Sequence, residues 1–130
     1  MGFNVGQVKH VAERMELRRM RDEAGKPLLD LPDAPLPEPE TPAPVRFIAV
    51  WDAMLLVHAR RTGVLPEEYR PRIFSTKTPH SFNTFLIDGQ VAGTWRVEDG
   101  AVELSPFRKL TATERRELEE EAVRLTAFHA

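Results

Sequence analysis

Apolar residues near the N-terminus repeat first with a helical period and then with a strand-like period. Residues 5–16 carry an apolar side chain at about every third or fourth position, which predicts an amphipathic helix. Residues 17–21 alternate in polarity, residues 22–26 (DEAGK) have turn chemistry, and residues 28–31 are suited to a second strand. A helix followed by a β-hairpin is therefore expected in this part of the chain.

The middle of the chain predicts one strand and two helices. Residues 45–50 (VRFIAV) form a short apolar run typical of a strand. Residues 51–61 place apolar side chains on one helical face that begins with Trp51, so we expect a helix with Trp51, like Trp95, in the core. Residues 65–69 (LPEEY) predict another short helix, because proline suits the first turn and the helix dipole favours acidic side chains there.

Beyond residue 80 the apolar period becomes two. Residues 82–87, 91–97 and 101–104 are strand-like, and the Asp-Gly pairs at 88–89 and 99–100 separate them. Asp-Gly is a strong signal for a tight hairpin turn. Three antiparallel strands in a meander are therefore expected.

The last segment, residues 111–128, predicts a long helix. Thr111 and Glu114 fit a capping box, in which each side chain accepts a hydrogen bond from the backbone amide of the other residue. The predicted apolar stripe comprises Leu118, Ala122, Leu125 and Phe128. The expected fold class is α+β: a barrel-like antiparallel meander packed by this helix, with an N-terminal helix and hairpin.

A proline-rich segment divides the chain. Residues 32–44 (PDAPLPEPETPAP) hold six of the eleven prolines, so neither a helix nor a central strand is expected there. The segment is either an extended, polyproline-like strap or a disordered tether. We therefore expect a partial winged helix in residues 1–31 (a helix and a wing hairpin), a strap in residues 32–44, and an α+β domain in residues 45–130.

The composition of the 130 residues excludes several kinds of chemistry. There is no cysteine, so disulfides, cysteine-rich zinc sites and thiol nucleophiles are ruled out. None of the four histidines lies within four positions of another, and no phosphate-binding loop, HExxH or GxSxG motif occurs. We expect no metal and no cofactor. Without an apolar run of membrane-spanning length or a signal-peptide core, a cytoplasmic protein with no membrane partner is expected.

The net charge of −2 argues against binding nucleic acid through bulk charge, but it permits a local basic face. Arginine is well suited to phosphate because its planar fork donates two hydrogen bonds at once. The competing interpretation is an ordinary solvated surface with local ion pairs. The candidate DNA-contacting residues are Arg18, Arg19, His58, Arg60, Arg61, Arg70 and Arg72, with Lys77 close to them in the sequence.

Four motifs carry a family resemblance: DLPDAPLPEPETPAPVRF, LLVHAR, LPEEYR and IDGQVAGTWR. With the residues between them, from Leu17 to Phe128, they resemble the C-terminal part of the bacterial winged-helix DNA-binding domain family. The resemblance implies a longer protein in which tandem winged helices precede a β-barrel-like domain. It also implies a link to glycosylases that unhook alkylated or crosslinked bases.

The glycosylases of that family carry two catalytic residues, Gln and Gln or Gln and Asp, separated by one apolar residue. Only Gln7-Val8-Lys9 has a similar spelling here, and its third residue is a lysine. We therefore assign no catalytic residue from the resemblance.

Three functions are compatible with these observations. The first is a DNA-binding or accessory domain of a winged-helix, glycosylase-like protein, without catalysis of its own and with duplex DNA as its partner. The second is a DNA glycosylase acting on alkylated or crosslinked bases, assisted by Asp52 and His58, although Asp52 also suits a helix cap and His58 the edge of a core. The third is a protein-interaction module that binds itself or a winged-helix partner through Val5, Val8 and Met15.

Overall fold

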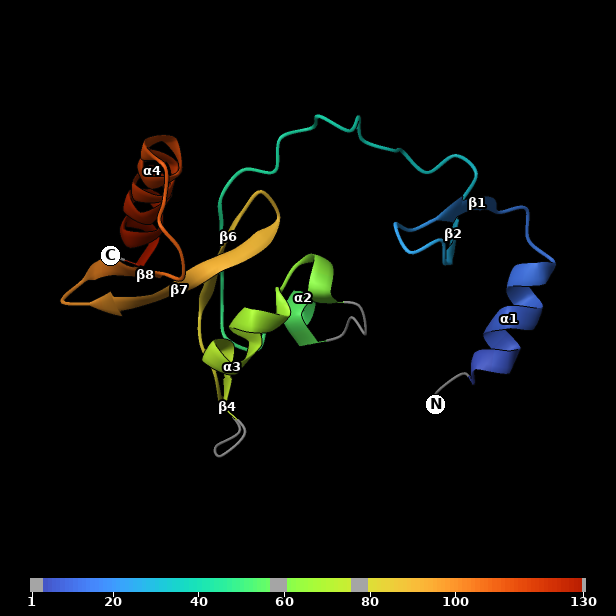
Figure 1. The fold of residues 1–130 in the computed structure, drawn as a ribbon, viewed down its shortest axis with the longest axis horizontal. Coiled ribbons are helices and arrows are strands. Elements are labelled where there is room, and N and C mark those ends of the chain that lie inside the picture. Colours follow the sequence, from blue (N-terminus) through green and yellow to red (C-terminus); the bar gives the residue numbers. More distant parts are fainter. Residues whose placement is uncertain (1–3, 57–60, 76–79, 130) are drawn as a thin grey trace. The chain divides into compact units, whose positions relative to one another are not determined.

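The computed structural model describes residues 4–56, 61–75 and 80–129 (Figure 1). The chain divides into two compact units, Met1–Thr41 and Pro42–Ala130. The division falls within the proline-rich segment. Each unit is described by itself.

The N-terminal unit contains one helix and one β-hairpin. Helix α1 (Val5–Glu13) begins at a capping box, in which the Gln7 amide donates to Asn4 Oδ1 at 2.9 Å and the Asn4 amide donates to Gln7 Oε1 at 3.0 Å. Strands β1 (Arg18–Arg21) and β2 (Pro27–Asp30) pair antiparallel. The predicted helix and hairpin are confirmed, although the helix ends three residues earlier than its apolar pattern suggested.

The C-terminal unit is built on a four-stranded antiparallel sheet. Its strands are β3 (Arg46–Ile48), β6 (Thr84–Ile87), β7 (Gln90–Glu98) and β8 (Ala101–Pro106), in the order β3-β6-β7-β8. The predicted three-stranded meander is confirmed as β6-β7-β8, and the apolar run at residues 45–50 supplies the fourth strand. The sheet is open, with β3 and β8 at its edges.

The two Asp-Gly pairs form the tight turns of the meander. Asp88 and Gly89 have φ angles of 49° and 73°, and Asp99 and Gly100 have φ angles of 50° and 78°. Positive φ at both central residues is the geometry of a type I′ turn, which matches the twist of the strands that it joins.

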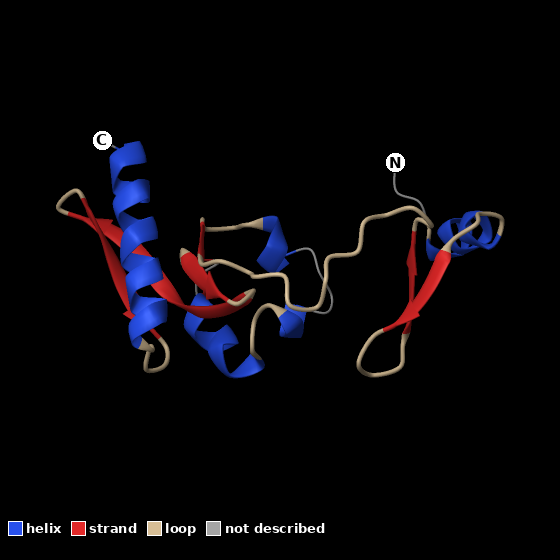
Figure 2. Cartoon of the chain, turned by 90° about the horizontal axis from the view of Figure 1, so that it is seen from above, coloured by secondary structure: helices blue, strands red, loops and turns tan. Residues whose placement is uncertain are grey.

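Short helices and one long helix complete the unit. They are α2 (Ala53–Leu56), the 3-10 turns η1 (Arg61–Gly63) and η2 (Glu67–Tyr69), α3 (Arg70–Ile73) and α4 (Ala112–His129). A small hairpin, β4 (Phe74–Ser75) and β5 (His80–Ser81), follows α3. Figure 2 shows α4 running alongside the sheet, and the short helices form a separate group.

Both faces of the sheet are covered. Successive side chains of β6 point to opposite faces, so this strand contributes to the core on each side. Phe85 and Ile87 pack with Leu110 and Leu118, which hold α4 on one face. Leu86 packs on the other face in a second cluster with Ile48, Leu55, Leu65, Ile73 and Val91, which holds α2 and α3. The α+β class and the C-terminal helix packed on the sheet are confirmed.

The prediction of a helix beginning at Trp51 is wrong. Trp51 has a φ angle of 59°, which no α-helix contains, and α2 begins only at Ala53. The Trp51 side chain is 49% exposed and does not enter the core. Trp95 does pack against the core, where its indole N–H donates to the carbonyl of Ile48 at 3.1 Å.

The predicted apolar stripe of α4 is correct only in part. Leu118 is fully buried and Leu125 is half-buried, whereas Phe128 is 83% exposed. Leu118, the fully buried residue of this helix, lies in its N-terminal half. Phe128 lies in the last turn and does not reach the core.

Candidate nucleic-acid interface

The two arginines predicted at the start of the hairpin have different roles. Arg18 is half-buried, and its guanidinium donates to the carbonyl of Ala34 at 3.2 Å and to that of Pro32. It therefore ties β1 to the beginning of the proline-rich segment. Arg19 points to the other side of the strand and is exposed. It lines a shallow hollow with Met20, Arg21, Pro27 and Leu29.

The structure describes only some of the basic residues predicted between His58 and Lys77. His58, Arg60 and Lys77 lie outside the described residues, and of Arg61 only the backbone, in η1, is described. Arg70 and Arg72 both lie on α3. Arg70 is half-exposed and forms a long ion pair, 3.7 Å, with Glu67.

Arg72 stacks on an aromatic pair. Its guanidinium carbon lies 3.9 Å from the ring centroid of Phe107, and Phe107 in turn contacts Tyr69 at a centroid distance of 4.9 Å. Among the described side chains, no carboxylate pairs with Arg72. A guanidinium that rests its face on a ring keeps its N–H donors at the edge, where they remain available to a phosphate.

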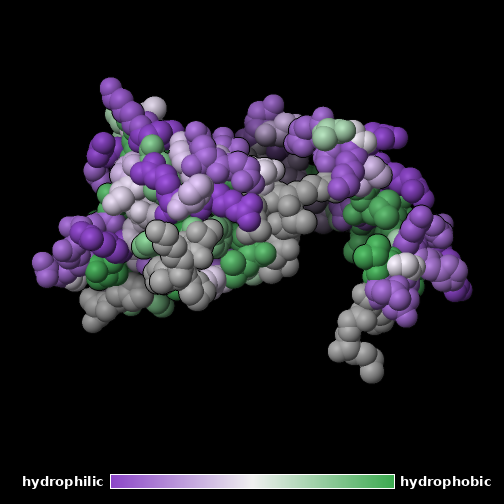
Figure 3. Space-filling view, turned by 60° about the horizontal axis from the view of Figure 1, so that its bottom comes forward, coloured by the Kyte–Doolittle hydropathy of each residue, from purple (hydrophilic) through white to green (hydrophobic). Residues whose placement is uncertain are grey.

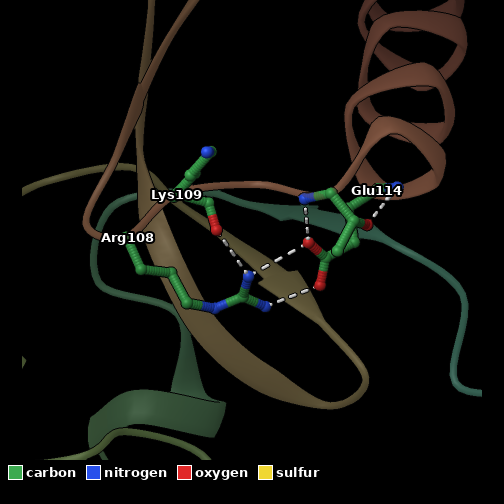
Figure 4. Close-up of polar contacts among 4 residues, drawn as sticks. Arg108, Lys109 and Glu114 are labelled. Atoms are coloured by element: carbon green, nitrogen blue, oxygen red, sulfur yellow. Dashed lines mark hydrogen bonds and ion pairs between the residues drawn. The ribbon is translucent and has the colours of Figure 1, made fainter.

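Two further basic residues, Arg108 and Lys109, follow Phe107 directly and are not among the residues predicted from the sequence. Arg108 donates to Glu114 at 2.7 and 3.0 Å and to the carbonyl of Lys109 at 3.2 Å (Figure 4). In the same view the amine of Lys109 points away from this ion pair. The available signal in the sequence was Glu114, already expected in a capping box, because a glutamate this close along the chain can form an ion pair with Arg108.

The ion pair of Arg108 belongs to the helix start. The hydrogen bond from Arg108, followed by that from the Thr111 amide, lowers the pKa of Glu114 from 4.5 to about 2. The same hydrogen bond raises the pKa of Arg108. Thr111 and Glu114 also form the predicted capping box, with the amides donating at 2.8 and 3.2 Å. Arg108 therefore positions α4 and is not a free cation.

Arg96 is likewise paired. It bridges Glu98 and Glu103, donating to Glu103 at 2.8 and 3.2 Å. The hydrogen bond to Glu103 is the main cause of the raised pKa of Arg96, and it lowers the pKa of Glu103. Arg96 and Arg108 are therefore engaged within the unit, whereas Arg72 has no carboxylate partner among the described side chains.

Asp52, the candidate acidic group, serves a local role. Its carboxylate accepts a hydrogen bond from the Met54 amide at 2.8 Å, which confirms the interpretation as a helix cap. Within residues 4–56, 61–75 and 80–129, no three acidic or histidine side chains are grouped as a metal site. In the same residues, no helix has the length and apolar character of a transmembrane span.

A family model described as DNA glycosylase AlkZ-like matches residues 1–128. The chain belongs to the AlkZ-like DNA glycosylase family. The glycosylase-like part of the resemblance is therefore confirmed, whereas the correspondence to a winged-helix C-terminal region stays a prediction.

A solved structure similar to this member of the AlkZ-like family is the DNA glycosylase AlkZ of Streptomyces sahachiroi. It matches with a TM-score of 0.71 and 20% sequence identity, over 93% of this chain and 33% of that one. The likeness shows that the two share a fold, and this chain spans about a third of the length of that protein. No curated protein sequence matches this AlkZ-like chain significantly.

Proposed function

We propose that this chain is a DNA-contacting accessory domain of a glycosylase-like protein, without base-excision chemistry of its own. Family membership supports duplex DNA as the partner. The observation that carries the proposal is Arg72, a cation supported by Phe107 and unpaired among the described side chains. Arg19 and Arg70 add exposed positive charge.

We further propose that the organisation follows the family resemblance. Residues 1–31 are the end of a winged helix, residues 32–44 are a strap, and residues 45–130 are the C-terminal domain. A helix followed by a hairpin in the first unit supports this assignment, as does a match to only a third of the AlkZ chain.

The test is binding to duplex DNA at low and moderate salt. We expect affinity to fall with salt, because each neutralised phosphate releases counterions. The double variant Arg70→Ala/Arg72→Ala should bind more weakly and lower the salt slope by about two.

The matched control is Arg116→Ala. Arg116 lies on α4, on the other face of the sheet, and contacts Glu120 at 4.0 Å. It should leave both affinity and slope unchanged. Binding no better than that of an acidic control protein, with no salt slope, would end the proposal.

A glycosylase acting on alkylated or crosslinked bases is the alternative, and the family name favours it. Incubation with alkylated DNA should release no base under the accessory-domain proposal. Asp52→Asn separates the two, because asparagine can still cap α2 but lacks the carboxylate. Base release by the native chain that is lost in Asp52→Asn would establish the enzyme.

An interaction module is a further candidate, favoured by the apolar face of α1. Val8, Val11 and Ala12 of α1 line an open hollow together with Met15, which follows the helix, and no residue of α1 is buried. Figure 3 shows apolar surface on the N-terminal unit. A face of this kind usually marks a contact surface.

Sedimentation tests the module. We expect the native chain to self-associate and Val8→Asp to be monomeric, whereas Val97→Asp, an equally exposed valine of β7, should behave as native. A native chain that stays monomeric at high concentration would contradict it.

A further inference from the structure

Trp51 is held in a conformation that a bulky side chain rarely adopts. Its φ angle of 59° lies in the left-handed region, where the β-carbon of a large residue clashes with the backbone. Such strain persists only where the surroundings enforce it, and it is concentrated at functional sites.

Four hydrogen bonds hold the backbone around this residue. The Trp51 amide donates to the hydroxyl of Ser81 at 3.0 Å, and the Val50 amide donates to Asn83 Oδ1 at 2.9 Å. On the C-terminal side, the Asp52 carboxylate accepts from Met54, and the Asp52 carbonyl accepts from the Leu55 amide at 3.1 Å. Since Ser81 is itself buried, the segment is clamped from within the unit.

The result is an indole presented outside the core. Trp51 is half-exposed, as are its neighbours Val50, Met54, Leu56 and Phe82. The adjacent Leu55 is only 3% exposed and anchors α2. Leu55 is therefore directed into the core, whereas the Trp51 side chain is left exposed to solvent.

Cations accompany this indole on the same layer. α2 and α3 cover the same face of the sheet through Leu55 and Ile73. Ser81, which binds the Trp51 amide, pairs in β5 with Phe74, two residues after Arg72. The layer therefore carries an exposed indole together with the exposed arginines of α3.

We propose that Trp51 is a base-stacking residue that inserts at a disrupted step of duplex DNA. This inference rests on the proposed DNA-contacting function and names the part of DNA that this site takes. Proteins that bend or open DNA insert apolar side chains between base steps, and every base offers a flat face for stacking. The clamped backbone fixes where the indole is presented, so the strain serves as preorganisation.

Fluorescence gives the direct test, because the chain has two tryptophans and Trp95 is engaged in the core. We expect a short duplex with a single abasic site to quench the emission of the native chain, and an intact duplex to quench it less. Trp51→Phe should bind the same duplex but lose most of the quenching.

Affinity gives the second test. Trp51→Gly removes the indole and relieves the positive φ, since glycine adopts that conformation freely. It should remain folded by circular dichroism, bind the abasic duplex about ten-fold more weakly, and keep the native salt slope. The control Phe128→Ala, which removes an exposed aromatic side chain on α4, should bind as the native chain does.

The two proposals fail in different ways. If the native chain binds DNA but Trp51→Gly binds equally well, or if binding leaves the emission unchanged, base stacking is excluded and the DNA-contacting function stands. If Trp51→Gly instead changes only the oligomeric state, Trp51 belongs to a protein interface. If the native chain binds no DNA, both proposals fail.

Discussion

Gly93 occupies a position in β7 where no side chain fits. A β-carbon there would overlap the ring of Phe85, which is fully buried, and would lie 2.6 Å from the carbonyl oxygen of Ser105. Neither neighbour can withdraw, because one belongs to the core and the other to the backbone of β8.

Gly93→Ala should therefore lower the free energy of unfolding by about 2–3 kcal/mol, the upper range for overpacking. Urea unfolding measures the loss. The control is Gly63→Ala, because no atom of the described residues lies within 4 Å of the position of its β-carbon. An equal effect of both substitutions would contradict this account.

Thr84 carries a buried hydroxyl that has no hydrogen-bond partner among the described residues. An unsatisfied buried polar group costs about 1–3 kcal/mol, whereas a methyl group of the same shape has no such cost. Thr84→Val should therefore raise the free energy of unfolding by about 1 kcal/mol. Thr84→Ser, which keeps the hydroxyl and deletes the methyl, should lower it, and urea unfolding of both compares the two. A less stable valine variant would show that the hydroxyl is satisfied.

The arginines show that the residue type alone does not determine which partner a side chain binds. Arg18 and Arg72 were both predicted to contact phosphate, and Arg96 is the same residue type. Arg18 binds backbone carbonyls, Arg96 binds two glutamates, and Arg72 rests on a ring. The partners of Arg18 and Arg72 lie 14 or more positions away, so no local pattern predicts them.

At the scale of elements, the start of α4 couples charge to stability. Folding lowers the pKa of Glu114 from 4.5 to about 2, chiefly through Arg108. A lowered pKa contributes stability that is present above 4.5 and is lost as the pH falls toward 2.

Glu114→Gln should therefore be less stable than the native chain at pH 7, and the difference should narrow between pH 4.5 and pH 2. Urea midpoints across this range measure it. Glu120→Gln is the control, because the exposed contact of Glu120 with Arg116 is 4.0 Å long. If the stability difference between the native chain and Glu114→Gln did not change with pH, the charge of Glu114 would not be its cause.

The elements with local signals were predicted well. The capping box of α4 and the Asp-Gly turns depend on residues within four positions of one another, so the sequence alone predicts them. The helix expected to begin at Trp51 begins at Ala53 instead, because the side chains of Ser81 and Asn83, about thirty positions away, fix the backbone at Val50 and Trp51. Residues 57–60 of that prediction lie outside the described residues.

At the scale of the whole molecule, the buried core lies in one unit. All the buried apolar residues of the described chain, from Val45 to Leu118, belong to Pro42–Ala130, whereas no side chain within residues 4–41 is buried. Cooperative unfolding depends on such a core.

A fragment of residues 42–130 should therefore fold alone, with a single thermal transition close to that of the full chain. Residues 1–41 alone should show no cooperative transition, because a helix and a two-stranded hairpin without a core are marginal in water. Circular dichroism on heating distinguishes these outcomes. A fragment 42–130 that does not fold would mean that the first unit is needed for the core.

The candidate interface was predictable only in outline. The sequence placed Arg70 and Arg72 together, and the structure puts both on α3. Nothing in the sequence indicated that Trp51 faces outward, and the sign that Arg108 is neutralised was Glu114 in the predicted capping box. His58, Arg60 and Lys77 lie outside the described residues, so their role stays a prediction.

The sequence by itself determined the helices at both ends, the β1–β2 hairpin, the β6–β7–β8 meander and the α+β class, because caps, turns and apolar periods act over a few residues. Only the tertiary structure decided which arginines are paired, that β3 joins β6, and that one tryptophan is inside while the other is outside. Those outcomes depend on groups brought together from distant positions, and burial or pairing is a property of the assembled fold.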